Sequence, residues 1–375
     1  MTIVIERDDV EVHELIDALA VDSPVTRVPW KPSVASMFGE RLLRSTTGPL
    51  GRQAGRVIAR SLALVTGVAL AAASGGLGTA RASQRLATPR VTRRATLATS
   101  PDQAELVSRI AGPRFYHAID DFTASPWAPV RVLEAERKLI DSCRGVFAVS
   151  TTLADTLAIR HGISRASITV LPNAVPADLI ATVPPVPHLR RHEAADRAPP
   201  VAGVLGSLSS RIRLSWLREV VHATPWLHWR FVGGITESEL APGDRFHLRW
   251  LEGHPRCRFE GRRAYRQLVQ YATKLDVAVM PYSERSNNSH GSPARMFAHL
   301  AAGHPILSTP GCDQVDELAG KLVTSCDDPG ALIAELEHLR DRRFDDGLHR
   351  ARWELAHQHT WSQRAQVLRD VIDRG

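Results

Sequence analysis

Short apolar runs alternate with amphipathic stretches along most of the chain. Runs of apolar and β-branched residues predict buried strands at residues 2–5, 25–28, 96–99, 114–118, 145–149 and 168–171. Apolar residues at helical spacing predict helices at residues 10–19, 102–110, 130–143 and 151–161. Because strands that alternate with helices usually pair in parallel, the pattern predicts an α/β domain with a parallel sheet.

A proline-rich polar stretch interrupts this alternation near the middle of the chain. Residues 181–200 contain five prolines and show no apolar periodicity, which marks a linker. A second series of strands and helices begins at Val201. Two such domains that face each other would bind ligands at the carboxyl ends of their strands, in the cleft between them.

A short helix that begins near Ser292 and leads into a strand is the most informative element. Ser292 is a favoured N-cap, Pro293 suits the first helical position, and Gly303 ends the helix. Unpaired N–H groups at such a start face the preceding polar loop, residues 286–291, where they could hold a phosphate, and Arg295 adds a cation. An ordinary capped helix in an α/β domain would explain the same residues.

The segment around this helix resembles the C-terminal signature of GT-B glycosyltransferases, particularly the retaining family 4 group. That signature is a Pro, a Lys or Arg, and then Glu-Tyr-Leu-Ala-Ala-Gly-x-Pro-Val-Val-x-Thr. The matching residues are Pro293, Arg295, Leu300, Ala301, Ala302, Gly303, Pro305 and Thr309. The resemblance continues in register through most of the chain, at residues 116–122, 147–150, 170–175, 201–208, 229–234, 257–261, 275–282, 327–329 and 361–364.

The resemblance implies an α/β protein of GT-B type, with two Rossmann-like domains facing each other across a cleft. Residues 1–180 would form the acceptor-side domain, residues 181–200 the linker and residues 201–355 the nucleotide-sugar-binding domain. Residues 356–375 would form a closing helix that packs back on the first domain. The implied activity is transfer of a hexose-like sugar, with retention, from a nucleotide diphosphate sugar to a glycan or lipid-linked acceptor. No cofactor is expected.

The resemblance also assigns residues to the site. Donor-binding positions would be Gly206, Ser207, Gly261, Arg262, Pro281, Tyr282, Asn288, Ser289, Gly291 and Ser292. Arg211 and Arg295 would stabilise the negative charge that develops on the leaving diphosphate, and Arg213 is an alternative to Arg211. His117 would border the transferred sugar. Asp120 and Asp121 lie in the loop that follows the predicted strand at residues 114–118, where they could bind acceptor hydroxyls or a cation. Each of these residues also has a purely structural explanation. The arginines could lie on the surface, His117 could simply end a strand, and the two aspartates could cap a helix or a turn.

The chain departs from the family at two positions that matter for activity. Two glutamates flank this helix start in the family, one near the transferred sugar and one on the ribose hydroxyls, and the matching residues are His290 and Ala298. His290 could be a catalytic residue that replaces the carboxylate of the family, by donating hydrogen bonds between the sugar and the phosphate. The departure leaves two alternatives open: a noncatalytic GT-B-like partner protein that binds nucleotide or glycan, and a sugar-nucleotide epimerase.

Composition indicates the class of protein and the compartment in which this activity would take place. The chain has 375 residues, 43% hydrophobic and 23% charged, which is typical of a folded protein with more than one domain. Its four cysteines form no C-x-x-C pair, no D-x-D occurs in a matching strand context, and an acidic start argues against a secretory signal. We therefore expect reduced thiols, no metal site and a cytoplasmic protein.

Positive charge is concentrated in the segment 30–94, where Glu40 is the only acid among many arginines. Apolar residues lie between these arginines, including a run at residues 62–73 that is too short to span a bilayer. The segment predicts peripheral contact with an anionic membrane at the inner face of the plasma membrane. Together with the family resemblance, this contact implies a role in envelope glycan synthesis. A solvated arginine-rich surface remains an alternative. No aromatic stripe or zinc spacing points to nucleic acid.

Overall fold

The computed structural model describes residues 2–6, 10–21, 25–29, 95–124, 132–181, 199–284 and 286–374. The basic segment 30–94 and most of the predicted linker lie outside the described residues. The predictions made for them, including membrane contact, therefore stay predictions.

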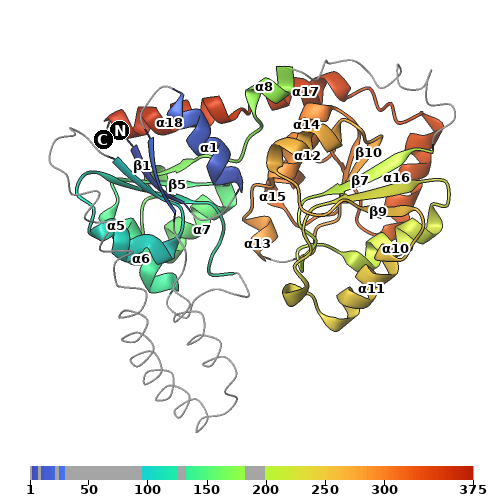
Figure 1. Cartoon of the computed structure of the whole chain (residues 1–375), viewed down its shortest axis with the longest axis horizontal. Coiled ribbons are helices and arrows are strands. Elements are labelled where there is room, and N and C mark those ends of the chain that lie inside the picture. Colours follow the sequence, from blue (N-terminus) through green and yellow to red (C-terminus); the bar gives the residue numbers. More distant parts are fainter. Residues whose placement is uncertain are drawn as a thin grey trace, which may run out of the picture.

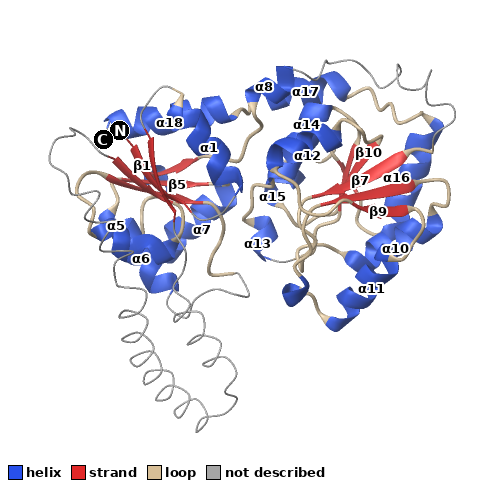
Figure 2. Cartoon of the chain, viewed as in Figure 1, coloured by secondary structure: helices blue, strands red, loops and turns tan. Residues whose placement is uncertain are grey.

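The described chain forms two α/β lobes (Figures 1 and 2). The sheet of the N-terminal lobe is parallel, with the strand order β2-β1-β3-β4-β5-β6. Its strands are β1 (Thr2–Glu6), β2 (Val25–Pro29), β3 (Ala95–Ala98), β4 (Arg114–Ala118), β5 (Gly145–Ala148) and β6 (Ile168–Val170). Its helices are α1 (Val10–Ala20), α5 (Ala104–Ser108), α6 (Val132–Ser142) and α7 (Thr151–His161), and the short α8 (Ala177–Ala181) follows the lobe.

The sheet of the C-terminal lobe is also parallel, with the order β12-β11-β10-β7-β8-β9. Its strands are β7 (Val201–Leu205), β8 (His228–Val232), β9 (Cys257–Phe259), β10 (Val277–Met280), β11 (Ile306–Ser308) and β12 (Thr324–Ser325). Its helices are α10 (Leu214–Ala223), α11 (Pro242–Glu252), α12 (Tyr265–Ala272), α13 (Ser286–Ser289), α14 (Ala294–Ala302), α15 (Asp313–Asp316), α16 (Pro329–Asp341) and α17 (His349–His357). This is the doubly wound Rossmann order, whose topological switch point lies between β7 and β10. A ligand site is expected at the loops that follow these two strands.

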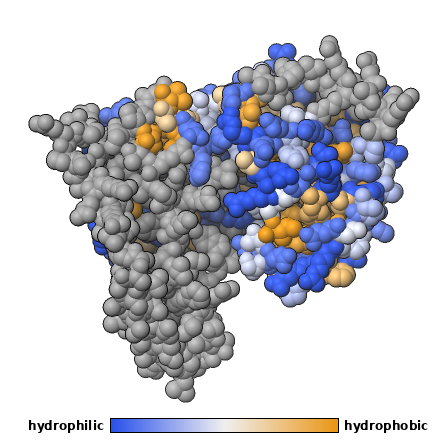
Figure 3. Space-filling view, in the orientation of Figure 1, coloured by the Kyte–Doolittle hydropathy of each residue, from blue (hydrophilic) through white to orange (hydrophobic). Residues whose placement is uncertain are grey.

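Each lobe has its own buried core because its strands are covered by helices on both faces. All four residues of β10 are buried, and the side chains of β7 and β8 pack with α10 and α16. Figure 3 shows that the visible face of the C-terminal lobe is mostly hydrophilic, with one hydrophobic area over its lower part. Within the described ranges, no helix combines the length and apolarity that crossing a membrane requires.

The last helix, α18 (Trp361–Arg374), returns to the N-terminal lobe (Figure 1). Its residues Trp361 and Leu368 are buried in one cluster with Leu15 of α1 and Phe147 of β5. The chain thus crosses between the lobes a second time. The segment that leads into α18 pairs with the segment that leaves the N-terminal lobe after β6. Val175 N donates a hydrogen bond to His359 O (3.0 Å), and Trp361 N donates one to Val175 O (3.1 Å).

The predicted α/β architecture with two Rossmann-like units is confirmed. Strand β4 and helix α7 have the predicted bounds, 114–118 and 151–161. The predicted helix 102–110 is shorter than expected, because it opens with a 3-10 turn at Pro101–Gln103 before α5. There the Gln103 side chain accepts a hydrogen bond from Thr99 N (2.8 Å).

Candidate functional site

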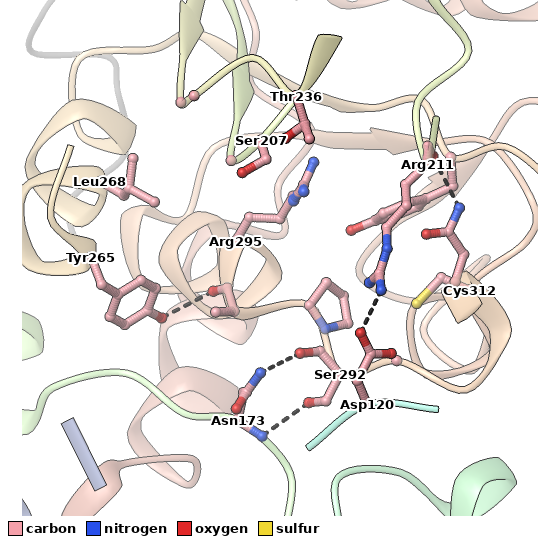
Figure 4. Close-up of a pocket in the computed structure, with 18 of the residues that line it drawn as sticks. Asp120, Asn173, Ser207, Arg211, Thr236, Tyr265, Leu268, Ser292, Arg295 and Cys312 are labelled. Atoms are coloured by element: carbon pink, nitrogen blue, oxygen red, sulfur yellow. Dashed lines mark hydrogen bonds and ion pairs between the residues drawn. The ribbon is translucent and has the colours of Figure 1, made fainter. Parts of the chain in front are cut away.

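A cavity of about 590 Å³ lies where the two lobes meet, and both lobes line it (Figure 4). This volume suits a ligand of cofactor or nucleotide size. The N-terminal lobe contributes the loops after β4 and β6, with Ile119, Asp120, Phe122 and Asn173. The C-terminal lobe contributes Gly206, Ser207, Arg211, Gly233, Gly234, Ile235, Thr236, Arg262, Arg263, Tyr265, Leu268, Tyr282, Asn288, Gly291, Ser292, Pro293, Ala294, Arg295 and Cys312.

Arg295 lies in the first turn of α14 and reaches toward the loop after β7 (Figure 4). That loop turns at Gly206, whose φ is +89°, and a Cβ built on Gly206 would lie 2.7 Å from Arg295 Cζ. The guanidinium also stands 5.6 Å from the centre of the Tyr282 ring. Its Nη1 is buried and has no hydrogen-bond partner among the described residues. A buried, unsatisfied cationic donor on a cavity wall is suited to an anion.

The start of α14 differs from the prediction that Ser292 caps this helix. The helix begins at Ala294, with Pro293 in the N-cap position and no side-chain cap. The Ser292 hydroxyl instead accepts a hydrogen bond from Asn173 N (2.9 Å), and the Asn173 side chain donates to Ser292 O. The start of α14 still faces the cavity, where the first N–H groups of a helix have no intrahelical acceptor.

Arg211 also lines the cavity, but its side chain turns toward the N-terminal lobe (Figure 4). Its Nη2 lies 2.5 Å from Asp120 Oδ2, in an ion pair that joins the two lobes. The backbone oxygen of Arg211 accepts a hydrogen bond from the Asn288 side chain (2.9 Å). Both predicted arginines therefore border the cavity, and one of them is already paired.

His290 does not line the cavity, although it directly precedes Gly291, which does. Its Nδ1 lies 2.7 Å from Asp121 Oδ2 and its Nε2 lies 3.3 Å from Thr156 Oγ1, both in the N-terminal lobe. Burial alone would raise the pKa of the Asp121 carboxyl, but hydrogen bonds from His290, Arg160 and Thr123 outweigh burial and hold that pKa well below its usual range. The imidazole is thus directed at a permanently ionised carboxylate.

His117 is not brought to the cavity either. It lies within β4, pairs in register with Phe147 of β5 and is 3% exposed. Its Nε2 is 3.1 Å from Leu171 O. Burial lowers the pKa of His117 to about 4, and the hydrogen bond with Leu171 offsets only part of this effect. The imidazole is therefore neutral at pH 7, in a structural position.

The structure brings most of the predicted donor-binding residues together. Those that line the cavity are Gly206, Ser207, Arg262, Tyr282, Asn288, Gly291 and Ser292, whereas Gly261, Pro281 and Ser289 do not. Of the two acceptor-side aspartates, Asp120 lines the cavity and Asp121 does not. Ala298 is 0% exposed within the core, so its side chain is not available to a ligand.

Several cavity residues were not predicted, and Asn173 and Tyr265 are the most informative. Asn173 follows β6 and could have been found by looking for polar residues at the carboxyl ends of strands. The Tyr265 hydroxyl lies 2.9 Å from Ala174 O and 3.0 Å from Ala294 O, and so connects the lobes beside the start of α14. The apolar spacing of α12 gave no sign of this polar role. The described part of the chain holds no cluster of His, Cys, Asp or Glu side chains arranged for a metal ion.

Comparison with solved structures identifies the fold. HepE from Anabaena, crystallised with UDP-glucose, matches with a TM-score of 0.67 over 100% of this chain and 99% of HepE, at 15% sequence identity. A UDP-forming trehalose-phosphate synthase from Burkholderia xenovorans matches with a TM-score of 0.63 over 99% of this chain and 98% of the synthase, at 12% identity. The chain has the GT-B fold. The cavity occupies the interlobe cleft of that fold, as the resemblance implied.

Sequence comparison gives a more limited match. No protein-family model matches the chain. A protein named as the teichuronic acid biosynthesis glycosyltransferase TuaH, from Bacillus subtilis, is 21% identical over 165 residues. The matched region spans 43% of this chain and 40% of TuaH, less than half of either protein.

Proposed function

We propose that this protein is a glycosyltransferase that uses a nucleotide diphosphate sugar as its donor. The observation that carries the proposal is the buried Nη1 of Arg295, which has no hydrogen-bond partner in the described part of the chain and belongs to a residue that lines the interlobe cavity at the start of α14. A guanidinium and free helix N–H groups together form a site for a phosphate. HepE, with the same fold, has been solved with UDP-glucose, which supports UDP as the first nucleotide to test.

The charges around the cavity agree with a diphosphate diester. Four arginines line it, and two of them have carboxylate neighbours: Arg211 binds Asp120, and Arg263 lies 3.9 Å from Glu260. The other two, Arg262 and Arg295, form no ion pair with any carboxylate of the described residues. Two unpaired guanidinium groups match the two negative charges of a nucleotide diphosphate sugar.

In the proposed reaction an acceptor hydroxyl oxygen bonds to the anomeric carbon of the sugar, and the bond from this carbon to the diphosphate oxygen breaks. The hydroxyl proton passes to the departing diphosphate on the same face of the sugar, so the configuration is retained. Arg295 and the N–H groups of α14 stabilise the charge that develops on the diphosphate. We propose that these groups do so without a metal ion or a cofactor.

The acceptor would bind on the side of the cavity that the N-terminal lobe lines with Ile119, Asp120 and Phe122. We propose a glycan or a lipid-linked acceptor of the cell envelope. The partial similarity to TuaH and the arginine-rich segment 30–94 support this choice. The same features support a cytoplasmic protein that acts peripherally at the inner membrane face.

A noncatalytic, ligand-binding GT-B protein is the second candidate. It is favoured by the two positions where the family carries glutamates, because Ala298 is inside the core and His290 is bound to Asp121. Neither position offers the cavity a carboxylate. A sugar-nucleotide epimerase fits less well, because Asp120 is the one acid among the described residues that line the cavity, and it is paired with Arg211.

Calorimetric titration with UDP, GDP, ADP and dTDP, followed by turnover of the matching sugar nucleotides, tests the proposal. We expect one nucleotide to bind, and Arg295→Met to weaken its binding roughly tenfold to a hundredfold, as for loss of a hydrogen bond to a charged group. Arg350→Met is the control, because Arg350 is 81% exposed and pairs only with Glu354 among the described residues. Binding with sugar transfer or donor hydrolysis supports the enzyme, and binding alone supports the noncatalytic candidate. Absence of binding by all four nucleotides would contradict the enzyme and would leave the noncatalytic candidate only as a protein that binds a glycan.

A further inference from the structure

Two adjacent aspartates in the loop after β4 reach two different loops of the C-terminal lobe. Asp120 pairs with Arg211, which follows β7, at 2.5 Å. Asp121 pairs with His290, which follows α13, at 2.7 Å. These loops lie on either side of the switch point between β7 and β10. One short segment of the N-terminal lobe therefore holds both loops that border the proposed diphosphate site.

The Asp121 carboxylate is fixed within its own lobe before it meets His290. Its side chain is 2% exposed, and its oxygens accept hydrogen bonds from Arg160 Nη2 (2.8 Å) and Thr123 Oγ1 (2.7 Å). Arg160 is held in turn by Glu136, whose carboxylate also contacts His161 and Tyr116. This buried network presents a rigid anionic acceptor to the opposite lobe.

His290 fits this acceptor through more than one contact. Besides Asp121, its ring meets Thr156, and its backbone oxygen accepts a hydrogen bond from Ser150 Oγ (2.6 Å). Only 16% of its side chain is exposed. Because His290 immediately precedes Gly291, these contacts also fix the backbone that leads into α14.

The contact made by Asp120 is different in kind. Its side chain is 21% exposed and that of Arg211 is 31% exposed, and both residues line the cavity. An ion pair that water reaches is weak, and an entering anion can replace the carboxylate on the guanidinium. Arg211 can therefore exchange one partner for the other.

We propose that Asp120 and Asp121 form a two-part clasp between the lobes. Asp121 holds the cleft closed through His290, and Asp120 occupies Arg211 until a diphosphate takes its place. Both aspartates are thus positioning residues rather than acceptor ligands. The second half of the clasp rests on the proposed function, because it requires a diphosphate at Arg211, whereas the first half does not.

Small-angle X-ray scattering without ligand tests the first half. His290→Ala and Asp121→Asn should increase the radius of gyration by separating the lobes, and the conservative His290→Gln should remain close to the wild type. The control is Arg266→Ala, which removes an interlobe ion pair with Glu14 and a second pair with Asp178. Circular dichroism checks that each lobe stays folded, and His290→Ala removes no part of the buried network in the N-terminal lobe. A radius unchanged in His290→Ala would overturn this half.

Calorimetry with inorganic diphosphate tests the second half, because this probe carries neither base nor sugar. Asp120→Asn should tighten diphosphate binding several-fold by freeing Arg211. Removing a negative charge could have the same effect through the general field of the cavity, so the substitution is repeated in an Arg211→Met background. If diphosphate replaces Asp120 on Arg211, Asp120→Asn should no longer tighten diphosphate binding in the Arg211→Met background. Tighter binding that persists in this background would contradict the exchange. If no variant binds diphosphate, the exchange and the proposed donor site both fail, while the scattering result still decides the first half.

Discussion

The position of Arg295 depends on the absence of a side chain at Gly206. The backbone there has a φ of +89°, and the Arg295 guanidinium occupies the space that a Cβ would fill. A single glycine thus permits both the turn after β7 and the close approach of the cation.

We expect Gly206→Ala to displace Arg295 and to weaken nucleotide binding about tenfold or more, through loss of a charge-assisted hydrogen bond. The left-handed backbone should add about 1 to 2 kcal/mol of destabilisation. Gly162→Ala is the matched control, since Gly162 has a φ of +63° and no atom within 4 Å of the built Cβ. Calorimetry and urea denaturation of both variants separate the two effects. Equal nucleotide affinity in the two variants would contradict the role given to Gly206.

His117 should make stability depend on pH. Its pKa is lowered to about 4 in the folded state, so between pH 6.5 and 4 the unfolded chain binds a proton that the folded chain does not. Stability from this group is therefore complete above pH 6.5 and falls on acidification, by up to about 3 kcal/mol near pH 4. In urea denaturation from pH 7.5 to 4.5, His117→Gln should show a flatter decline than the wild type. His228→Gln, at an exposed position, should follow the wild type.

Helix α7 begins at a residue that serves two elements at once. Ser150 is its N-cap: the hydroxyl oxygen accepts a hydrogen bond from Leu153 N (3.0 Å), and the hydroxyl O–H donates one to His290 O (2.6 Å). The cap of a helix in one lobe is therefore also a contact with the other lobe.

Replacing Ser150 by Ala should cost about 1 kcal/mol for the cap and should also loosen the lobes. Asp328→Ala at the N-cap of α16 provides the comparison, because Asp328 Oδ1 accepts from Ala331 N (2.8 Å) and caps only its own helix. Urea denaturation should show similar losses for both. Scattering should show lobe separation only for Ser150→Ala, and equal radii would argue against the second role of Ser150.

Elements with local causes were predictable from the sequence, whereas contacts between distant residues were not. Strand β4 and helix α7 follow from adjacent apolar residues and a good cap, so their bounds were correct. Ser292 is a favoured N-cap residue and is followed by a proline, yet its hydroxyl is bound by Asn173 N, 119 residues away. His290 is likewise engaged by Asp121, 169 residues away. The general location of the site was predictable, but the partner of each side chain depends on how the lobes meet.

At the scale of the whole molecule, the N-terminal lobe is completed by the end of the described chain. Leu368 of α18 is fully buried against α1, whereas Val367 is 36% exposed. We expect Leu368→Ala to lower the free energy of unfolding by about 3 kcal/mol and Val367→Ala by less than about 0.5 kcal/mol. Hydrogen exchange should place the loss from Leu368→Ala in α1 and in β3 to β5. A loss confined to the C-terminal lobe would contradict this assignment.

The return of α18 also constrains how the protein is made. A ribosome releases the apolar residues of α1 and β5 long before Trp361 and Leu368, which share a core with them. Part of the interior of the N-terminal lobe therefore stays uncovered while the whole C-terminal lobe is translated. The lobe that is synthesised first is thus completed only after α18 has left the ribosome. Until then its uncovered apolar residues are available for a chaperone to bind.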